Sequence, residues 1–174
     1  MTLIPIDKIV YRQRMNRVIV VFVASLALLS VIFGSILIAL FGVAAEPGAA
    51  STGNFHWNLM GVLLALALCS AVLHSQRHQP ILHEVLYVWR LKQCHNKIYR
   101  KLAKVKAAAQ NNNINALIIL VFYYESLKQV YLLDDNTLTL PQVQQDLNAV
   151  MAQAESLNLS IDSSQFELSL LNQI

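Results

Sequence analysis

The chain has 174 residues, of which 56% are hydrophobic and only 13% are charged, and its formal net charge is +3. Because globular domains carry about 25% charged residues, this composition favours a membrane protein. Five glycines and four prolines exclude a collagen-like or low-complexity chain, and two cysteines, Cys69 and Cys94, provide no disulfide framework.

Two long apolar segments, 18–45 and 55–73, dominate the N-terminal part and flank a short polar turn at 46–54. Neither segment contains Asp, Glu, Lys or Arg. As helices they would extend over roughly 42 Å and 28 Å, compared with a hydrocarbon core of about 30 Å. We therefore expect a transmembrane hairpin over 18–73. A cleaved signal peptide ending near Ala45 is the alternative, but signal cores have only about 7–15 apolar residues.

Basic residues lie at both ends of this hairpin but not in the turn between its two spans. Segment 1–17 contains Lys8, Arg12, Arg14 and Arg17, the turn at 46–54 contains no Lys or Arg, and basic residues resume at Arg77. Since Lys and Arg concentrate in cytoplasmic loops, both termini are expected in the cytoplasm. In a bacterium this would be a multi-pass inner-membrane protein.

Small residues recur along one face of each predicted span. The second span has Gly61, Ala65 and Cys69 at four-residue spacing, and the first has Ser30 and Gly34. Helices approach closely in membranes through such residues, so these are candidates for packing between the two spans, or alternatively for a homodimer. The lack of charge inside either span argues against a transporter or channel.

The segment 81–174 is expected to form a small cytoplasmic helical domain. Its first predicted helix, Ile81–Ala109, has one apolar stripe and one basic face. The candidates for contact with lipid or a partner on this face are Arg90, Lys97, Arg100, Lys101 and Lys104.

A second predicted helix, Ile114–Leu133, follows a turn at Gln110–Asn113. Its apolar run 116–124 is too short to cross a bilayer, which favours a buried helix antiparallel to the preceding one. A re-entrant membrane segment is the alternative. After a turn at 134–137, a third helix is expected from Thr139 to about Leu157, and the remaining residues either open a short helix near Asp162 or fray.

The basic face Arg90–Lys106 is the best functional candidate. It suits anionic lipid headgroups or a topology signal, whereas an acidic protein partner is the alternative. Nucleic acid is the least favoured partner, since only Tyr99 lies among the cations.

No catalytic, cofactor-binding or metal-binding residue is predicted. His74 and His78 lack a supporting carboxylate or thiolate, and Pro80 interrupts the helix that would align them. Cys94 and His95 are adjacent, so on a helix they point about 100° apart and form a poor dyad. Phosphate-binding, dinucleotide-binding and metalloprotease motifs are missing from the sequence.

Several motifs resemble the small gammaproteobacterial membrane proteins grouped as domain-of-unknown-function family 3087, over about residues 1–157. The motifs that carry the resemblance are Ile6-Asp7-Lys8, Tyr11-Arg12, Asn16-Arg17, Trp57-Asn58-Leu59, Gly61, Tyr87-Val88-Trp89, Leu91-Lys92-Gln93, Ile98–Leu102, Ala116-Leu117-Ile118, Tyr123-Tyr124 and Leu133–Thr137. The resemblance implies a two-span inner-membrane protein with a helical cytoplasmic tail and no assigned activity.

These observations lead to an all-α membrane protein with three parts: a basic segment 1–17, a hairpin 18–73 and a helical domain 81–174. The expected role is a non-enzymatic accessory or scaffold subunit of a membrane complex that needs no cofactor. The alternative is a membrane-anchored regulatory module that binds anionic lipid or an acidic partner through its basic face. An enzyme with an unrecognised site is a third hypothesis. Other membrane subunits or a second copy are possible partners besides the bilayer.

Overall fold

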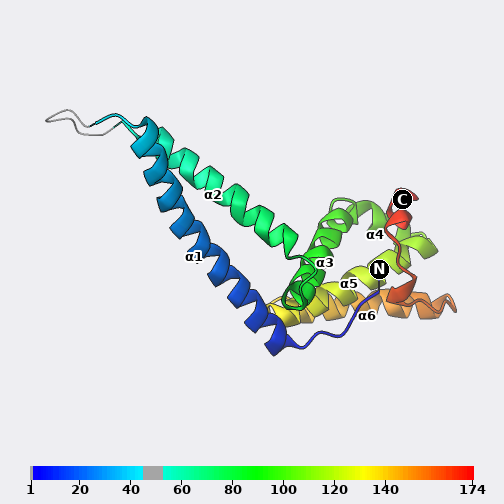
Figure 1. The fold of residues 1–174 in the computed structure, drawn as a ribbon. Coiled ribbons are helices and arrows are strands. Elements are labelled where there is room, and N and C mark those ends of the chain that lie inside the picture. The colour runs from blue at the N-terminus through cyan, green and yellow to red at the C-terminus, as the bar shows by residue number, and fades with distance from the viewer. Residues whose placement is uncertain (1, 45–52) are drawn as a thin grey trace. The chain divides into compact units, whose positions relative to one another are not determined.

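The computed structural model describes residues 2–44 and 53–174. Over these ranges the chain forms six α-helices and three short 3-10 helices joined by turns, with no strand (Figure 1). Most of the predicted turn at 46–54 lies outside the described residues. The helices form two compact units, one of residues up to Arg12 with Glu84–Ile174 and one of Gln13–His83. The predicted parts 1–17, 18–73 and 81–174 were defined by expected membrane topology, whereas these units are defined by contacts between residues. The predicted division therefore stays a prediction.

The unit Gln13–His83, called the hairpin unit below, is built from most of α1 (Lys8–Phe41), α2 (Phe55–Ser75) and the 3-10 helix η1 (Pro80–Leu82). α1 begins ten residues before its apolar segment because the Asp7 carboxylate accepts the Val10 N–H at 2.9 Å and caps the helix. Asn54 precedes α2, and its side chain bonds both the N–H and the carbonyl of Val43 at 3.1 Å and 3.0 Å. These bonds tie the end of α1 to the start of α2.

The second unit, called the helical unit below, contains α3 (His83–Tyr99), α4 (Leu102–Gln110), α5 (Ile114–Leu133), α6 (Leu140–Ser156) and the 3-10 helices η2 (Ser163–Gln165) and η3 (Leu168–Asn172). The first residue of α3, His83, is the one exception, because it belongs to the hairpin unit. α5 is the central element, since α4, α6, η2 and η3 all pack on it. Its buried side chains occur around most of its circumference, as expected for a helix enclosed by others.

The turns of the helical unit use residues that tolerate a left-handed backbone. Asn112, Asp135 and Asn158 follow α4, α5 and α6 with φ of 59°, 58° and 53°. The Asn113 side chain then caps α5 by accepting the Ala116 N–H at 3.1 Å. The predicted turns at 110–113 and 134–137 are both present.

The single helix predicted for Ile81–Ala109 is wrong, because the chain forms η1, α3 and α4, with a break at Arg100 and Lys101. At the break, the Lys101 N–H bonds the Ile98 carbonyl at 2.9 Å, three residues back instead of four. The Lys101 ammonium also donates to the Leu171 carbonyl of η3, a contact seventy residues away in sequence. The basic face is therefore divided between two helices. Tertiary packing overrides a continuous helical pattern here.

The predicted antiparallel pairing with Ile114–Leu133 is present through α4, and large apolar side chains of α3, α4 and α5 are buried. They include Leu91, Ile98, Val105, Leu117, Leu120 and Tyr124. The C-terminal segment is ordered as 3-10 turns, with a capping box between Asp162 and Gln165. Phe166 anchors it by stacking on Phe122 of α5, with ring centroids 4.0 Å apart.

Candidate functional site

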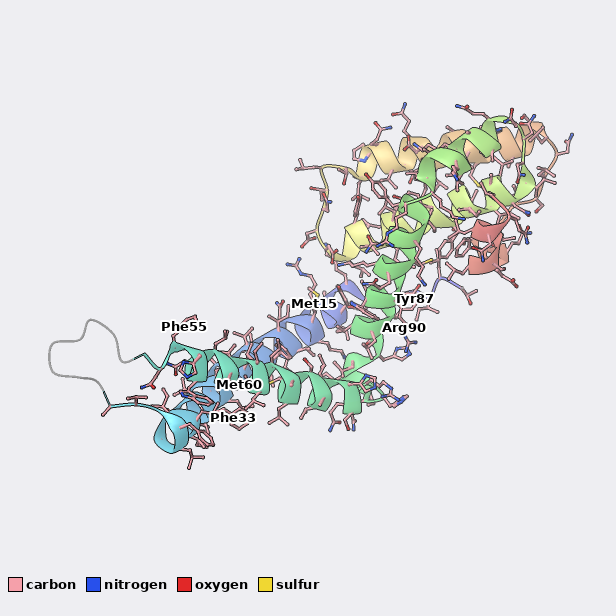
Figure 2. All side chains as sticks on the ribbon, turned by 90° about the horizontal axis from the view of Figure 1, so that it is seen from above. Met15, Phe33, Phe55, Met60, Tyr87 and Arg90 are labelled. Atoms are coloured by element: carbon pink, nitrogen blue, oxygen red, sulfur yellow. The ribbon has the colours of Figure 1, made fainter. Side chains whose placement is uncertain are left out.

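The small-residue stripe of α2 lies against α1 in the hairpin unit. Gly61, Ala65 and Cys69 are the buried residues of α2, and Gly34 is buried on α1. A methyl group at Gly61 would sit 2.5 Å from the Gly34 nitrogen and 2.7 Å from its Cα, so the two backbones touch there. Figure 2 labels Phe33 and Met60 beside this crossing. Ser30 is half-buried and bonds its own helix, through the Leu26 carbonyl at 2.6 Å.

Among the residues that the structure describes, three helices are long and apolar enough to cross a membrane: α1, α2 and α5. They differ in how much of their apolar surface the protein itself covers. In the most apolar stretch of each, 6% of α1 and 17% of α2 is buried, compared with 61% of α5. α1 and α2 thus present apolar side chains outward, whereas α5 turns most of its side chains into its own unit.

The basic residues between Arg90 and Lys106 fall into two groups. Three have partners inside the helical unit: Lys92 pairs with Asp134 at 2.7 Å, Lys101 donates to Leu171, and the Lys106 ammonium lies 6.0 Å from the centroid of the Tyr124 ring. Arg90, Lys97, Arg100 and Lys104 are exposed. Four of the five predicted contact residues are therefore exposed, and Lys101 is half-buried.

Two shallow hollows lie along this surface, with volumes of about 440 Å³ and 290 Å³. Both are lined by Lys97 and Leu168, so together they form one depression between α3 and the C-terminal turns. Trp89 and Arg90 line one end, and Lys101 lines the other. The depression combines cations with apolar surface.

An acidic turn holds the N-terminal segment to the helical unit, a role that sequence reasoning missed. Lys8 and Arg12 both pair with Asp135, and the Tyr11 hydroxyl lies 3.4 Å from Asp134. Tyr11 is 2% exposed, and its burial, followed by the charge of Asp134, raises its pKa to about 12. The sequence predicted only a turn at these positions. The one signal in the sequence was a pair of adjacent acids, Asp134 and Asp135, in a chain with more basic than acidic residues.

The backbone of Ile4 is held in the same unit by two side chains. Its N–H donates to the Tyr87 hydroxyl at 3.0 Å, and its carbonyl accepts from the Gln129 amide at 2.6 Å. Segment 2–12 is consequently part of the fold of the helical unit. A fragment beginning at residue 81 would lack these contacts, so experiments on this unit need the full chain.

A buried polar pair joins α3 to α5. His95 Nε2 lies 2.7 Å from the Ser126 hydroxyl oxygen, and that hydroxyl donates to the Tyr123 carbonyl at 3.0 Å. Because the hydroxyl proton is used there, we infer that Nε2 carries a proton and donates to Ser126. Ser126 is 0% exposed. The pair therefore fastens two helices together.

The burial of His95 makes stability depend on pH. Burial, and secondarily the charge of Lys92, lowers the pKa of His95 to about 4 from an ordinary value of 6.5. The unfolded chain binds this proton more readily, so the His95 contribution is complete above pH 6.5 and falls as the pH drops to about 4. The loss reaches about 3 kcal/mol. Urea unfolding of the full chain in detergent at pH 7 and pH 4.5 measures it.

The matched control is His95→Gln, whose amide can still donate to Ser126 but does not titrate. The pH dependence of the wild type should exceed that of H95Q by most of this amount. Equal pH dependence in the two proteins would contradict the assignment.

His74 and His78 both lie exposed on the surface. His74 Nε2 lies 2.6 Å from an Arg77 guanidinium nitrogen. Within residues 2–44 and 53–174, no group of three His, Cys, Asp or Glu side chains is placed to hold a metal ion.

The comparison with known proteins identifies a family. No curated protein and no solved structure matches the chain. One family model covers residues 1–171, nearly the whole chain, and its description is "Protein of unknown function (DUF3087)". The chain therefore belongs to the DUF3087 family.

Proposed function

We propose that this protein is an integral inner-membrane protein with two spans, α1 and α2, and with both termini in the cytoplasm. The observation that carries the proposal is the outward apolar surface of these two helices. Large apolar side chains such as Val20, Leu28 and Val31 are 64–68% exposed on a helix that has no charged residue from Val18 to Phe41. Apolar surface of this extent is unfavourable in water, whereas in a bilayer the hydrocarbon of the lipids buries it.

In this proposal α5 is a core helix and does not span. Its apolar side chains are already covered by its own unit, and it carries Glu125 and Lys128. The Lys128 ammonium donates to Gln144 of α6 at 2.6 Å. Moving α5 into a bilayer would expose this cation to hydrocarbon and uncover the apolar faces of α4 and α6.

We propose further that the protein serves as an accessory or scaffold subunit of a membrane complex. Support comes from the pairing of an apolar anchor with a helical unit that exposes large aromatic side chains, Trp89 at 56% and Tyr99 at 68%. Exposed aromatic residues are typical of contact surfaces between proteins. We expect the full chain, extracted in mild detergent, to run as a complex containing a second protein in reproducible ratio. A lone chain or a dimer of this chain would contradict the subunit role.

The depression along Arg90, Lys97 and Leu168 supports a second candidate, a module that binds anionic lipid headgroups or an acidic partner. Each cation close to an anionic membrane surface contributes about 1 kcal/mol of attraction. Trp89 is a built-in reporter for this contact because the sequence has only one other tryptophan. That residue, Trp57, stacks on Phe41 with ring centroids 5.2 Å apart, and Trp57→Phe keeps an aromatic ring there.

The test places the full-length W57F chain in phosphatidylcholine vesicles that contain brominated phosphatidylglycerol. Contact with anionic lipid predicts quenching of Trp89 fluorescence, weaker in high salt and weaker after Arg90→Gln, Lys97→Gln and Lys104→Gln are combined. Brominated phosphatidylcholine in place of the anionic lipid is the control for charge. If quenching is equal with both lipids and insensitive to salt, the lipid candidate fails and an acidic protein becomes the alternative.

A further inference from the structure

The two helices of the hairpin unit enclose an apolar groove that no side chain of this unit fills. They touch at Gly34 and Gly61. The start of α1 and the end of α2 draw apart, as both views show (Figures 1 and 2). The groove between them has a volume of about 390 Å³, within the range of roughly 300–1,000 Å³ typical of ligand pockets. It is lined by α1 between Arg17 and Leu29, by α2 between Leu68 and Leu73, by Gln76 just after α2, and by η1.

One end of the groove is polar, and the rest is lined by apolar side chains apart from Ser25. Arg17 and Gln76 lie at the same end because the two helices are antiparallel. Arg14 fixes the floor of this end by donating to the Pro80 carbonyl at 2.8 Å, next to Ile81 and Leu82 of η1. The interior is formed by side chains such as Phe22, Leu29 and Leu68. An occupant must therefore be an apolar chain that ends in an anionic or polar group.

The length of the groove fits one leaflet of a bilayer. From Arg17 to Leu29 the helix rises roughly 18 Å at about 1.5 Å per residue. One leaflet of hydrocarbon is about 15 Å thick, half of the full core of about 30 Å. In the proposed topology the polar end faces the cytoplasmic side, where anionic lipids attract basic residues next to a span. Both the length and the charge match a phospholipid that enters from that side.

We propose that this groove binds one anionic phospholipid, with an acyl chain along Phe22, Ser25 and Leu68 and the phosphate at Arg17. The proposal rests on the two-span topology proposed above. A bound acyl chain would fill the space left by the diverging helices, so the lipid acts as a third element of the hairpin. A second copy of this chain, with a helix in the groove, would be the competing occupant.

The test compares the full chain and its variants by native mass spectrometry in detergent with added phosphatidylglycerol or phosphatidylcholine. Ser25→Phe fills the groove from its half-buried wall, and Ala24→Phe, on the exposed side of the same turn, is the matched control. We expect the wild type and A24F to retain one phosphatidylglycerol and S25F to lose at least tenfold in its affinity. Arg17→Gln should abolish the preference for phosphatidylglycerol over phosphatidylcholine, and Arg17→Lys should restore most of it.

Three results overturn the proposal: equal lipid retention by S25F and A24F, no lipid preference in the wild type, or a lipid-free dimer that S25F disrupts. The dimer would identify a second copy as the occupant. The unfolding temperatures of S25F and A24F in detergent without lipid should agree. If that of S25F is much lower, S25F is misfolded, and the comparison of Arg17→Gln with Arg17→Lys tests the proposal instead. Failure of the topology itself appears separately: alkaline carbonate would release a chain that is not integral, and Leu138→Cys would react with an impermeant thiol reagent in spheroplasts if α5 crosses the membrane.

Discussion

Gly61→Val should separate α1 from α2 and destabilise the protein by about 3 kcal/mol, the upper part of the usual range for overpacking. The first carbon of the new side chain would lie 2.5 Å and 2.7 Å from two backbone atoms of Gly34. No rotamer relieves a clash with backbone, so the helices must move apart. Since packing at small residues is a main source of attraction between membrane helices, that movement loses much of their contact. Thermal unfolding of the full chain in detergent, followed by circular dichroism, measures the loss.

Ala67→Val is the matched control for this substitution. Ala67 lies on the same helix, is exposed, and receives the same side chain without meeting α1. Its unfolding temperature should stay close to that of the wild type. If G61V and A67V unfold at the same temperature, the close contact of Gly34 and Gly61 does not hold the hairpin together.

Phe166→Ala should cost about 3–5 kcal/mol, the usual range for deleting a buried aromatic ring. Phe166 is 1% exposed and stacks on Phe122, which is 0% exposed, at an interplanar angle of 10°. Without this ring the C-terminal turns lose their main anchor on α5. The Lys101 contact with Leu171 then loosens as well, because Leu171 belongs to the same segment. Urea unfolding gives the free energy, and limited proteolysis should cut the segment after Ser160 much faster than in the wild type.

Leu168→Ala is the control within the same segment. Leu168 is 44% exposed, so its truncation removes little buried area and should change the free energy of unfolding by less than about 1 kcal/mol. Equal proteolysis of F166A and the wild type would show that the segment is held by other contacts.

The parts of this structure that sequence predicts well are those with a local repeat. Gly61, Ala65 and Cys69 are four residues apart, so a helix must place them on one face, and they are the buried residues of α2. The burial of α5 was also predicted from its apolar run 116–124, although the whole helix proves long and apolar enough to cross a membrane. The turns on either side of α5 were marked by Asn and Asp residues.

Contacts between distant residues leave no such pattern. Asp134 and Asp135 look like ordinary turn residues, and nothing local shows that Lys8, Tyr11 and Arg12 reach them across more than 120 positions. The break after Tyr99 is hidden for the same reason, because its stabilising contact comes from Leu171. Of the five residues predicted for contact, only Lys101 has an internal partner, the Leu171 carbonyl, and the other four are exposed.

The number of spans is the central claim, and the accessibility of single cysteines tests it most directly. The two native cysteines, Cys69 and Cys94, are buried and are first replaced by alanine. Gly53→Cys, Tyr99→Cys and Leu138→Cys then place one thiol before α2, at the end of α3 and in the turn after α5, where Leu138 is 93% exposed.

A membrane-impermeant thiol reagent is applied to intact spheroplasts and to inside-out vesicles. Two spans predict that Gly53→Cys reacts in spheroplasts, whereas Tyr99→Cys and Leu138→Cys react only in inside-out vesicles. Reaction of Leu138→Cys in spheroplasts would place α5 across the membrane and contradict the account.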